Sequence, residues 1–350
     1  MRLNGCWGFC GNAYENPVCI ILHGRDAGAA CRRHPACRRN DVVAAMLQLI
    51  RIFRNRHHEL RAGWKILGFL GLAVGGFALP VALPRSWTST PFAGSFIPLA
   101  VVLAVTWLMV RLVNHKPLAA VGLWVHPRAL RECSMGLLLG FLMMSGIFLI
   151  EVSLGTLSLT WRGLTPLEIA GAVAISFLFF AASAMFEELL FRGYLLQTLM
   201  QSLSFLPALL IMSLFFGLAH YGNPHATLLS TANVVLAGIW LSFAYLKTRS
   251  LWLPFGLHLA WNFAQTTIYA FPTSGITFAE RRLWFSETSG PGWLTGGEFG
   301  PEGGILATVA LIAATWYILK TPLLRVPEGI ITLDSVEDVL PPPQPEETGT

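Results

Sequence analysis

Two adjacent glutamates stand in an apolar stretch of this sequence, and an arginine follows them. Glu187 and Glu188 lie in the segment SAMFEELLFRGYLL, together with Arg192. An ionisable residue at membrane depth costs about 2.5–3.5 kcal/mol on insertion scales, so a pair of glutamates requires a partner. On a helix, Glu188 and Arg192 share one face and can form an ion pair, which by itself could be purely structural. Glu187 points about 100° away from its neighbour and is free to face a cavity as a general base.

Two histidines occupy later apolar segments, each with a polar or aromatic residue one helical turn away. His220 ends the sequence FFGLAH, in which Phe216 lies four residues earlier, and His258 begins HLAWN, which ends at Asn262. Residues four apart on a helix point to the same side. A single histidine in such a segment is usually a packing residue. Two histidines, an asparagine and a glutamate pair together favour a reaction site.

The depth of these residues is a first test of whether they can meet. If the chain turns over near Ser204, Glu188 and His220 are equally far from the turn in sequence and lie level with each other. His258 fits this depth less well, because it follows the polar loop at Arg249 closely. A shallow, water-accessible site would reconcile the three positions.

The composition places these residues in a membrane protein. Of 350 residues, 54% are hydrophobic and only 12% are charged, against about 25% charged in soluble domains, and the mean hydropathy is +0.58. An ordinary water-soluble enzyme is therefore excluded. The apolar runs are 64–84, 92–113, 133–155, 167–190, 207–220, 227–246, 252–271 and 304–320. They predict an all-α, polytopic membrane protein with about eight transmembrane helices.

The distribution of charge predicts the orientation of these helices. Basic residues cluster before the first run and in two of the loops, at Arg111, Lys116, Arg128 and Arg131, and at Lys247 and Arg249. Such loops are typically cytoplasmic, which places both termini in the cytoplasm and favours a bacterial inner (plasma) membrane. The net charge of +5 is explained in this way, so no nucleic-acid partner is expected. The other membrane-domain glutamates, Glu132, Glu151 and Glu168, stand near segment ends and are interpreted as hydrated flanks.

The chain divides into three parts. Residues 1–63 form a basic N-terminal extension expected to be disordered and cytoplasmic, and its cysteines contain no Cys-x-x-Cys pair that would favour a zinc site. The working protein is hypothesised to begin near Met46. Residues 64–320 form the membrane domain, with a core at 167–271. Residues 321–350, which end in PPPQPEETGT, are expected to be a disordered C-terminal tail.

Three motifs in this order resemble the CPBP family, also called Abi, whose members are intramembrane metalloproteases of the CAAX prenyl endopeptidase and bacteriocin-processing type. They are Glu-Glu-x-x-x-Arg from Glu187 to Arg192, Phe-x-x-x-His from Phe216 to His220, and His-x-x-x-Asn from His258 to Asn262. The resemblance covers roughly residues 167–271. It implies that Glu187 and His220 activate the attacking water and that Arg192 orients Glu188.

The resemblance leaves two descriptions of the site open. In one, His258 and Asn262 steady the oxyanion of the tetrahedral intermediate; in the other, they help to bind a metal, and zinc would be held by Glu187, His220 and His258. The sequence contains no His-Glu-x-x-His helix of the zincin type. The expected activity is hydrolysis of a peptide bond in a membrane-associated or C-terminally processed peptide or protein.

Two other functions remain alternatives. The membrane carboxylates could form the proton relay of a transporter, although the two halves of the chain show no inverted repeat. The chain could also be an inactive membrane scaffold. Serine chemistry of the rhomboid type is disfavoured because no Gly-x-Ser-Gly occurs inside an apolar run. The lipid bilayer is an expected partner, while the natural substrate, its prenylation and the oligomeric state stay open.

Overall fold

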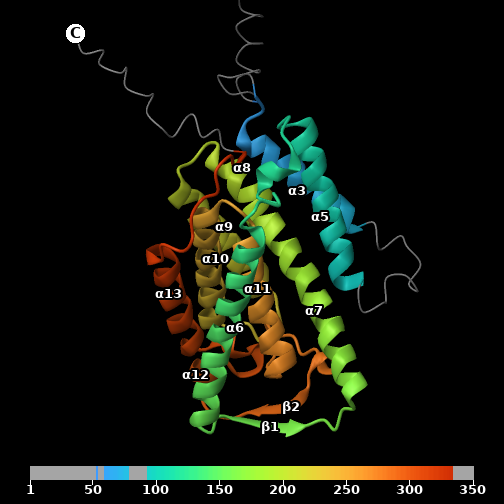
Figure 1. Ribbon diagram of the computed structural model, residues 1–350, viewed down its shortest axis with the longest axis vertical. Helices are drawn as coiled ribbons and strands as arrows, with labels where there is room; N and C mark the ends of the chain where they lie inside the picture. The colour runs from blue at the N-terminus through green and yellow to red at the C-terminus, as the bar shows by residue number, and fades with distance from the viewer. Residues whose placement is uncertain (1–52, 54–58, 79–92, 334–350) are drawn as a thin grey trace, which may run out of the picture. The chain divides into compact units, whose positions relative to one another are not determined.

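The computed structural model describes residues 53, 59–78 and 93–333 (Figure 1). The chain separates into two units, and the unit that begins at Leu60 carries the fold. Its principal helices are α3 (Ala62–Ala78), α5 (Ala93–Leu112), α6 (Ala129–Ser153), α7 (Pro166–Glu188), α8 (Leu196–Met200), α9 (Phe205–Tyr221), α10 (Leu228–Thr248), α11 (Trp252–Phe263), α12 (Gly292–Thr295) and α13 (Ile305–Lys320). The predicted N-terminal extension and the start near Met46 fall almost entirely outside the described residues.

Each apolar run of the sequence contains a helix, but not every helix is long enough to cross a bilayer. Among the described residues, four helices meet the length and apolarity of a membrane span, at Ala93–Leu112, Ala129–Ser153, Pro166–Met200 and Leu228–Thr248. The helices α3, α9 and α13 are apolar but shorter. The predicted helical membrane fold is therefore confirmed, whereas the count of about eight transmembrane helices is not.

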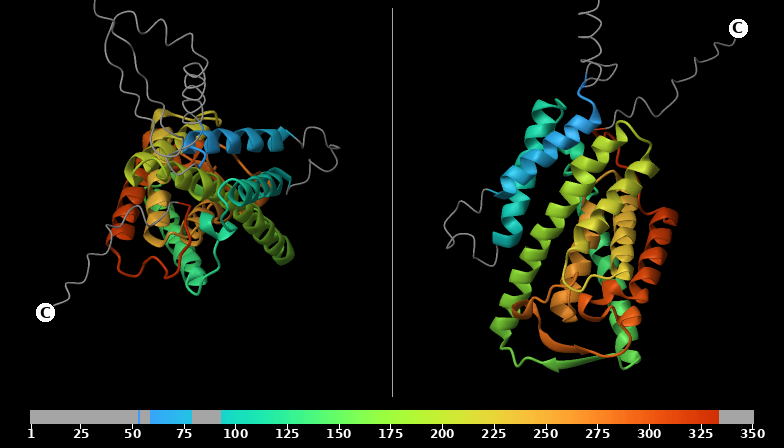
Figure 2. Two further views of the ribbon diagram at one scale, coloured as in Figure 1. Left: turned by 90° about the horizontal axis from the view of Figure 1, so that it is seen from above. Right: turned by 180° about the vertical axis from the view of Figure 1, so that it is seen from behind.

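Close packing of α6 against α11 depends on glycines. An added Cβ on Gly140 would lie 2.4 Å from the carbonyl oxygen of Leu257, and one on Gly256 would lie 2.4 Å from that of Cys133. Neither position has room for a side chain. The two backbones therefore approach closely, and α11, which carries His258 and Asn262, is held against α6 (Figure 2).

Further helix pairs complete the frame of the site. The helix α10 packs between α9 and α13, and α7 packs against α5 on one side and α11 on the other. One apolar core lies around Tyr194 and Tyr245, and a second lies around Trp240, Trp261 and the buried faces of α6 and α13. The motif-bearing helices α7, α9 and α11 are thus held together, with α10 in contact with both α9 and α11.

A small antiparallel sheet interrupts the expected all-α pattern. Strand β1 (Leu157–Trp161) pairs with β2 (Trp284–Thr288), and Leu157 lies opposite Thr288. Figure 1 shows this pair at the end of the helical unit opposite α8. The pairing joins the connection after α6 to the segment that follows α11.

The glutamates interpreted as hydrated flanks divide into two groups. Glu168 is exposed and forms a capping box with Thr165 at the start of α7, so that prediction is confirmed. For Glu132 and Glu151 the interpretation is wrong, because both are buried. Glu132 lies 3.3 Å from the Nε2 atom of His126. Tertiary contacts, not position within the segment, decide the burial of these two carboxylates.

The structure continues in contact with the helices beyond α13. Leu333 is buried in the core that contains Tyr194, and its carbonyl oxygen accepts hydrogen bonds from Gln201 at 3.0 Å and Lys116 at 3.3 Å. Residues 321–333 thus differ from the predicted disordered tail, since backbone hydrogen bonds and an inserted leucine hold their end in place. The rest of that tail lies outside the described residues.

Wide helical turns overlap one of the three motifs and follow another. The helix α7 continues into a π-helix at Leu189–Leu195, directly after Glu188, and α11 continues into a π-helix at Ala264–Ile268, just after Asn262. Such i→i+5 turns are rare and occur frequently at functional sites. Both lie next to residues that the sequence assigns to chemistry.

Candidate active site

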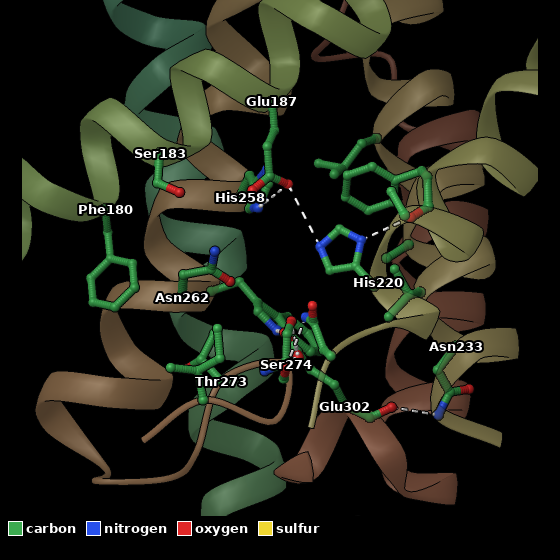
Figure 3. Close-up of a pocket in the computed structure, with 18 of the residues that line it drawn as sticks. Phe180, Ser183, Glu187, His220, Asn233, His258, Asn262, Thr273, Ser274 and Glu302 are labelled. Atoms are coloured by element: carbon green, nitrogen blue, oxygen red, sulfur yellow. Dashed lines mark hydrogen bonds and ion pairs between the residues drawn. The ribbon is translucent and has the colours of Figure 1, made fainter. Parts of the chain in front are cut away.

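Glu187 lies between the two motif histidines. Its Oε2 atom is 3.9 Å from the Nε2 atom of His220 and 3.8 Å from the Nε2 atom of His258 (Figure 3). The three side chains come from α7, α9 and α11. This Glu187 oxygen is buried and accepts no hydrogen bond from the described residues. The sequence-based expectation that Glu187 faces a cavity agrees with these positions, and its neighbour Glu188 is the residue expected to lie level with His220.

Glu188 forms the buried centre of a separate network. Its Oε1 atom accepts hydrogen bonds from Arg192 Nη1 at 3.0 Å and from His258 Nδ1 at 2.8 Å. Arg192 is 1% exposed, donates from Nη2 to the carbonyl oxygen of Gly238, and lies over the ring of Phe216 at 4.5 Å from its centroid. The predicted pairing of Glu188 with Arg192 is therefore present. The contact between Glu188 and His258 was not predicted from the sequence.

Hydrogen bonds fix the orientation of both imidazole rings. His220 Nδ1 lies 2.8 Å from the carbonyl oxygen of Phe216, which can only accept, so Nδ1 carries the proton and Nε2 presents a lone pair. His258 Nδ1 donates in the same way to the Glu188 carboxylate. Both rings therefore direct Nε2 toward Glu187. His258 can donate from Nε2 only when its ring is doubly protonated.

The site opens onto a cavity of about 410 Å³. Its walls are mainly apolar, with aromatic rings from α7, α10 and α11, and its polar atoms are concentrated near Glu187 and at the opposite end. Asn262 lines the cavity on the same helix as His258, as the four-residue spacing predicts. Ser183, one turn before Glu187, also faces this space (Figure 3). The apolar wall is formed by Phe179, Phe180, Phe216, Val234, Ala237, Trp240, Leu241, Trp261, Ile276, Phe278 and Leu311.

The far end of the cavity contains a carboxylate, Glu302, that was not predicted from the sequence. Glu302 accepts hydrogen bonds from the indole nitrogen of Trp261 at 3.1 Å and from the backbone nitrogen and hydroxyl of Ser274 at 2.8 and 2.7 Å. In the sequence Glu302 stands among glycines in an acid-leaning loop, which has no helical spacing to connect it with the motifs. The only available signal was its position directly before the last apolar run.

The donor atoms of the expected zinc site are of the right types but are not arranged as metal ligands. No group of three His, Cys, Asp or Glu residues with metal-binding geometry occurs in the part of the chain that the structure describes. Ligand atoms around tetrahedral zinc at about 2.0–2.1 Å would lie about 3.3 Å apart. The separations of 3.8 and 3.9 Å around Glu187 are longer. A water molecule that contacts Glu187 and an imidazole would lie beside these atoms, on the cavity side.

One comparison with known proteins identifies a family. Residues 169–264 match the family model described as type II CAAX prenyl endopeptidase Rce1-like. Neither the curated proteins nor the solved structures include a significant match to the chain. The matched segment contains all three motifs and the helices that bring Glu187, His220 and His258 together. This chain is an integral membrane protein whose segment 169–264 is similar to the Rce1-like type II CAAX prenyl endopeptidases.

Proposed function

We propose that this protein is an intramembrane endopeptidase that hydrolyses a peptide bond of a membrane-associated or C-terminally processed substrate. The observation that carries the proposal is the position of the Glu187 Oε2 atom between two imidazole Nε2 atoms. A water molecule held there can lose a proton to the carboxylate while His220 accepts its second hydrogen bond. The resulting hydroxide attacks the scissile carbonyl carbon.

His258 and Asn262 act on the oxyanion that forms in this step. His258 in its doubly protonated form donates from Nε2, and the Asn262 amide supplies a second donor from the same helix face. With His258 cationic, the charges of Glu187 and Glu188 are balanced by Arg192 and the imidazolium, so the buried group is neutral overall. Arg192 orients Glu188, and Glu188 in turn orients His258. Glu187 finally returns its proton to the leaving amine.

The cavity supports an apolar substrate. Its lining is mainly aromatic and aliphatic between the polar groups at Glu187 and those at the opposite end. The matched family is named for CAAX prenyl endopeptidases, so a prenylated C-terminal segment is a reasonable first probe. We further propose a bacterial inner-membrane location with both termini in the cytoplasm, supported by the basic loops.

Zinc stays a prediction that rests on the resemblance of the motifs. Glu187, His220 and His258 are the residues that would hold it, and the metal would lower the pKa of the attacking water. Metal analysis of the purified protein, with cleavage measured after chelation and after zinc is restored, distinguishes the two descriptions. Zinc-restored cleavage supports the metal, whereas unchanged cleavage after chelation supports the glutamate and histidines alone.

Replacing Glu187 tests the proposal. We expect Glu187→Gln to reduce cleavage about 10²- to 10⁴-fold without unfolding, because the general base is removed while the shape is kept. The measurement compares peptide termini in membranes that contain the wild-type protein, the variant or the control Glu287→Gln, which changes an exposed glutamate on β2. If the same peptide termini are found in equal amounts in all three membranes, the proposal is wrong. If Glu187→Gln impairs transport without changing the peptide termini, the proton relay is favoured. If it changes neither transport nor the termini, the scaffold is favoured.

A further inference from the structure

The two histidines that face Glu187 belong to helices whose main packing partners differ. The helix α9, which ends just after His220, packs mainly on α10, whereas α11, which carries His258, packs mainly on α6 and α7 and makes a smaller contact with α10. In the proposed reaction Glu187 acts together with both rings, and its Oε2 atom lies 3.9 Å from His220 Nε2 and 3.8 Å from His258 Nε2. The separation of the two rings is therefore sensitive to whatever joins the end of α9 to the middle of α11.

A chain of hydrogen bonds joins these two places across the far end of the cavity. Asn223, just after α9, donates from Nδ2 to the carbonyl oxygen of Ser274 at 2.9 Å. Ser274 donates from its backbone nitrogen and its hydroxyl to Glu302 Oε2 at 2.8 and 2.7 Å. Trp261 of α11 donates to Glu302 Oε1 at 3.1 Å. We call Asn223, Ser274, Glu302 and Trp261 the polar clasp; Figure 3 shows Ser274 and Glu302 on the side of the cavity away from Glu187.

The backbone that carries the polar clasp is itself tightly held. Gly275 adopts a φ of +80°, and a Cβ there would lie 1.9 Å from the carbonyl oxygen of Pro224, so the turn fits only as glycine. The backbone carbonyl of Glu302 accepts a hydrogen bond from Asn233 at 2.8 Å, and Thr308 donates to the same Asn233 side chain at 2.6 Å. Because this backbone is tightly held, the polar clasp can fix the end of α9 relative to α11.

We propose that Glu302 is a positioning residue that sets the separation of His220 and His258 through the polar clasp. The proposal rests on the proposed peptidase function and adds a residue outside the matched segment 169–264. Ser274 and Glu302 both lie beyond that segment, in a part of the chain to which the family match assigns nothing. Trp261 is adjacent to Asn262 and nearly one turn from His258, so its anchoring orients the catalytic face of α11.

The hydrogen-bond pattern makes Glu302 hard to replace even by glutamine. Both carboxylate oxygens act as acceptors, one for Trp261 and the other for Ser274. A glutamine has a single acceptor oxygen, so its amide group must face either the indole N–H or the Ser274 N–H, donor against donor. Glu302→Gln thus keeps the volume of the side chain but breaks one side of the clasp.

Kinetics of Glu302→Gln test the proposal. The probe is an internally quenched peptide with a farnesylated CAAX end, cleaved by the full-length protein in detergent micelles. We expect kcat per folded molecule to fall about 10-fold or more and KM to change less than 3-fold. The matched control is Glu287→Gln, which changes an exposed glutamate of the same connection between α11 and α13, and it should leave both constants unchanged. Kinetic constants of Glu302→Gln within 2-fold of the control overturn the proposal.

A second variant distinguishes positioning from loss of folding. Trp261→Phe removes the indole donor, so the double variant Glu302→Gln/Trp261→Phe no longer sets donor against donor, and the glutamine oxygen can serve Ser274. Both substitutions break the same link between Glu302 and α11, so we expect the kcat of the double variant, expressed per folded molecule, to be no lower than that of the more impaired single variant. If the double variant shows the product of the two single losses, or if the loss in Glu302→Gln merely follows the loss of folded protein, the proposal is wrong.

Hydrogen exchange separates failure of the clasp from failure of the peptidase proposal. In Glu302→Gln we expect faster amide exchange at residues 217–226 and 256–264 than in Glu287→Gln, whether or not the probe is cleaved. If wild-type protein cleaves no probe but this exchange increases, the clasp stands and the peptidase proposal fails. If exchange at both segments is unchanged, the clasp fails.

Discussion

His258 and Arg192 donate to the same carboxylate oxygen of Glu188, at 2.8 and 3.0 Å. The two adjacent glutamates therefore have different surroundings. Glu188 is fully buried, and its carboxylate binds the guanidinium of Arg192 and the imidazole of His258, whereas Glu187 lines the cavity. The ion pair that the sequence suggested is also the support of one catalytic histidine.

Removing Arg192 should destabilise the protein strongly. Arg192→Met leaves the Glu188 carboxylate buried without its cation, and breaking a buried pair in this way costs about 3–5 kcal/mol. Unfolding in detergent micelles, followed by circular dichroism, measures the loss. Arg111→Met, which changes an exposed arginine in the last turn of α5, is the control and should have little effect. Equal stability of the two variants would mean that the Glu188 network is not held by charge.

The two histidines should differ in what their removal does to stability. Both His220→Ala and His258→Ala are expected to lower kcat about 10²- to 10⁴-fold, since each faces the attacked water. Only His258→Ala also removes a hydrogen bond to the charged Glu188, which costs about 1.5–3 kcal/mol. Thermal unfolding of both variants beside the wild type checks the difference. A larger loss in His220→Ala would contradict the assigned network.

Asn262 should contribute to the rate without contributing to stability. Its side chain lines the cavity, so Asn262→Ala is expected to lower kcat about 10²- to 10³-fold through the loss of an oxyanion donor. Asn262→Asp keeps the size but places a negative charge beside the oxyanion, and it should be at least as impaired. Steady-state kinetics on the farnesylated probe measure both effects. An active Asn262→Asp variant would exclude the oxyanion role.

Two glycines on one helix provide a matched test of helix packing. Gly140→Ala would place a Cβ 2.4 Å from the carbonyl oxygen of Leu257 and push α11 away, which costs about 1–3 kcal/mol in an overpacked core. Gly146→Ala lies on the same α6 with nothing within 4 Å and should be neutral or slightly stabilising. Melting temperatures of the two variants give the comparison. Equal effects would show that α6 and α11 can separate without cost.

The sequence predicts those parts of the site that follow from spacing along one helix or across one hairpin. The four-residue interval places Arg192 against Glu188, and the turn near Ser204 predicts that His220 reaches the depth of this glutamate pair, where it lies 3.9 Å from Glu187. The polar clasp could not be predicted, because Glu302 meets Trp261 only through the fold of a long glycine-rich loop. The burial of Glu132 and Glu151 was missed for a related reason, since segment-end position does not reveal which element covers a side chain.

The membrane fold was predictable in kind but not in count. Apolar runs locate each helix well, because every long stretch without charge must satisfy its own backbone hydrogen bonds. The length of each helix depends on local turns and on neighbours. The sheet of β1 and β2 forms from residues far apart in the chain, which no periodicity of the sequence connects.

The wide turn after Glu188 has a consequence for comparing this chain with its relatives. A π-helical turn accommodates one residue more than an α-helical turn does, so the residues before and after Leu189–Leu195 follow two different helical phases. The upstream phase directs Glu187 to the cavity, and the downstream phase begins with Leu196, which lies in the apolar core. A homologue that lacks the wide turn must be one residue shorter at this place to keep both faces aligned. A single-residue gap in an alignment there would therefore mark a change in helix geometry with the active site retained.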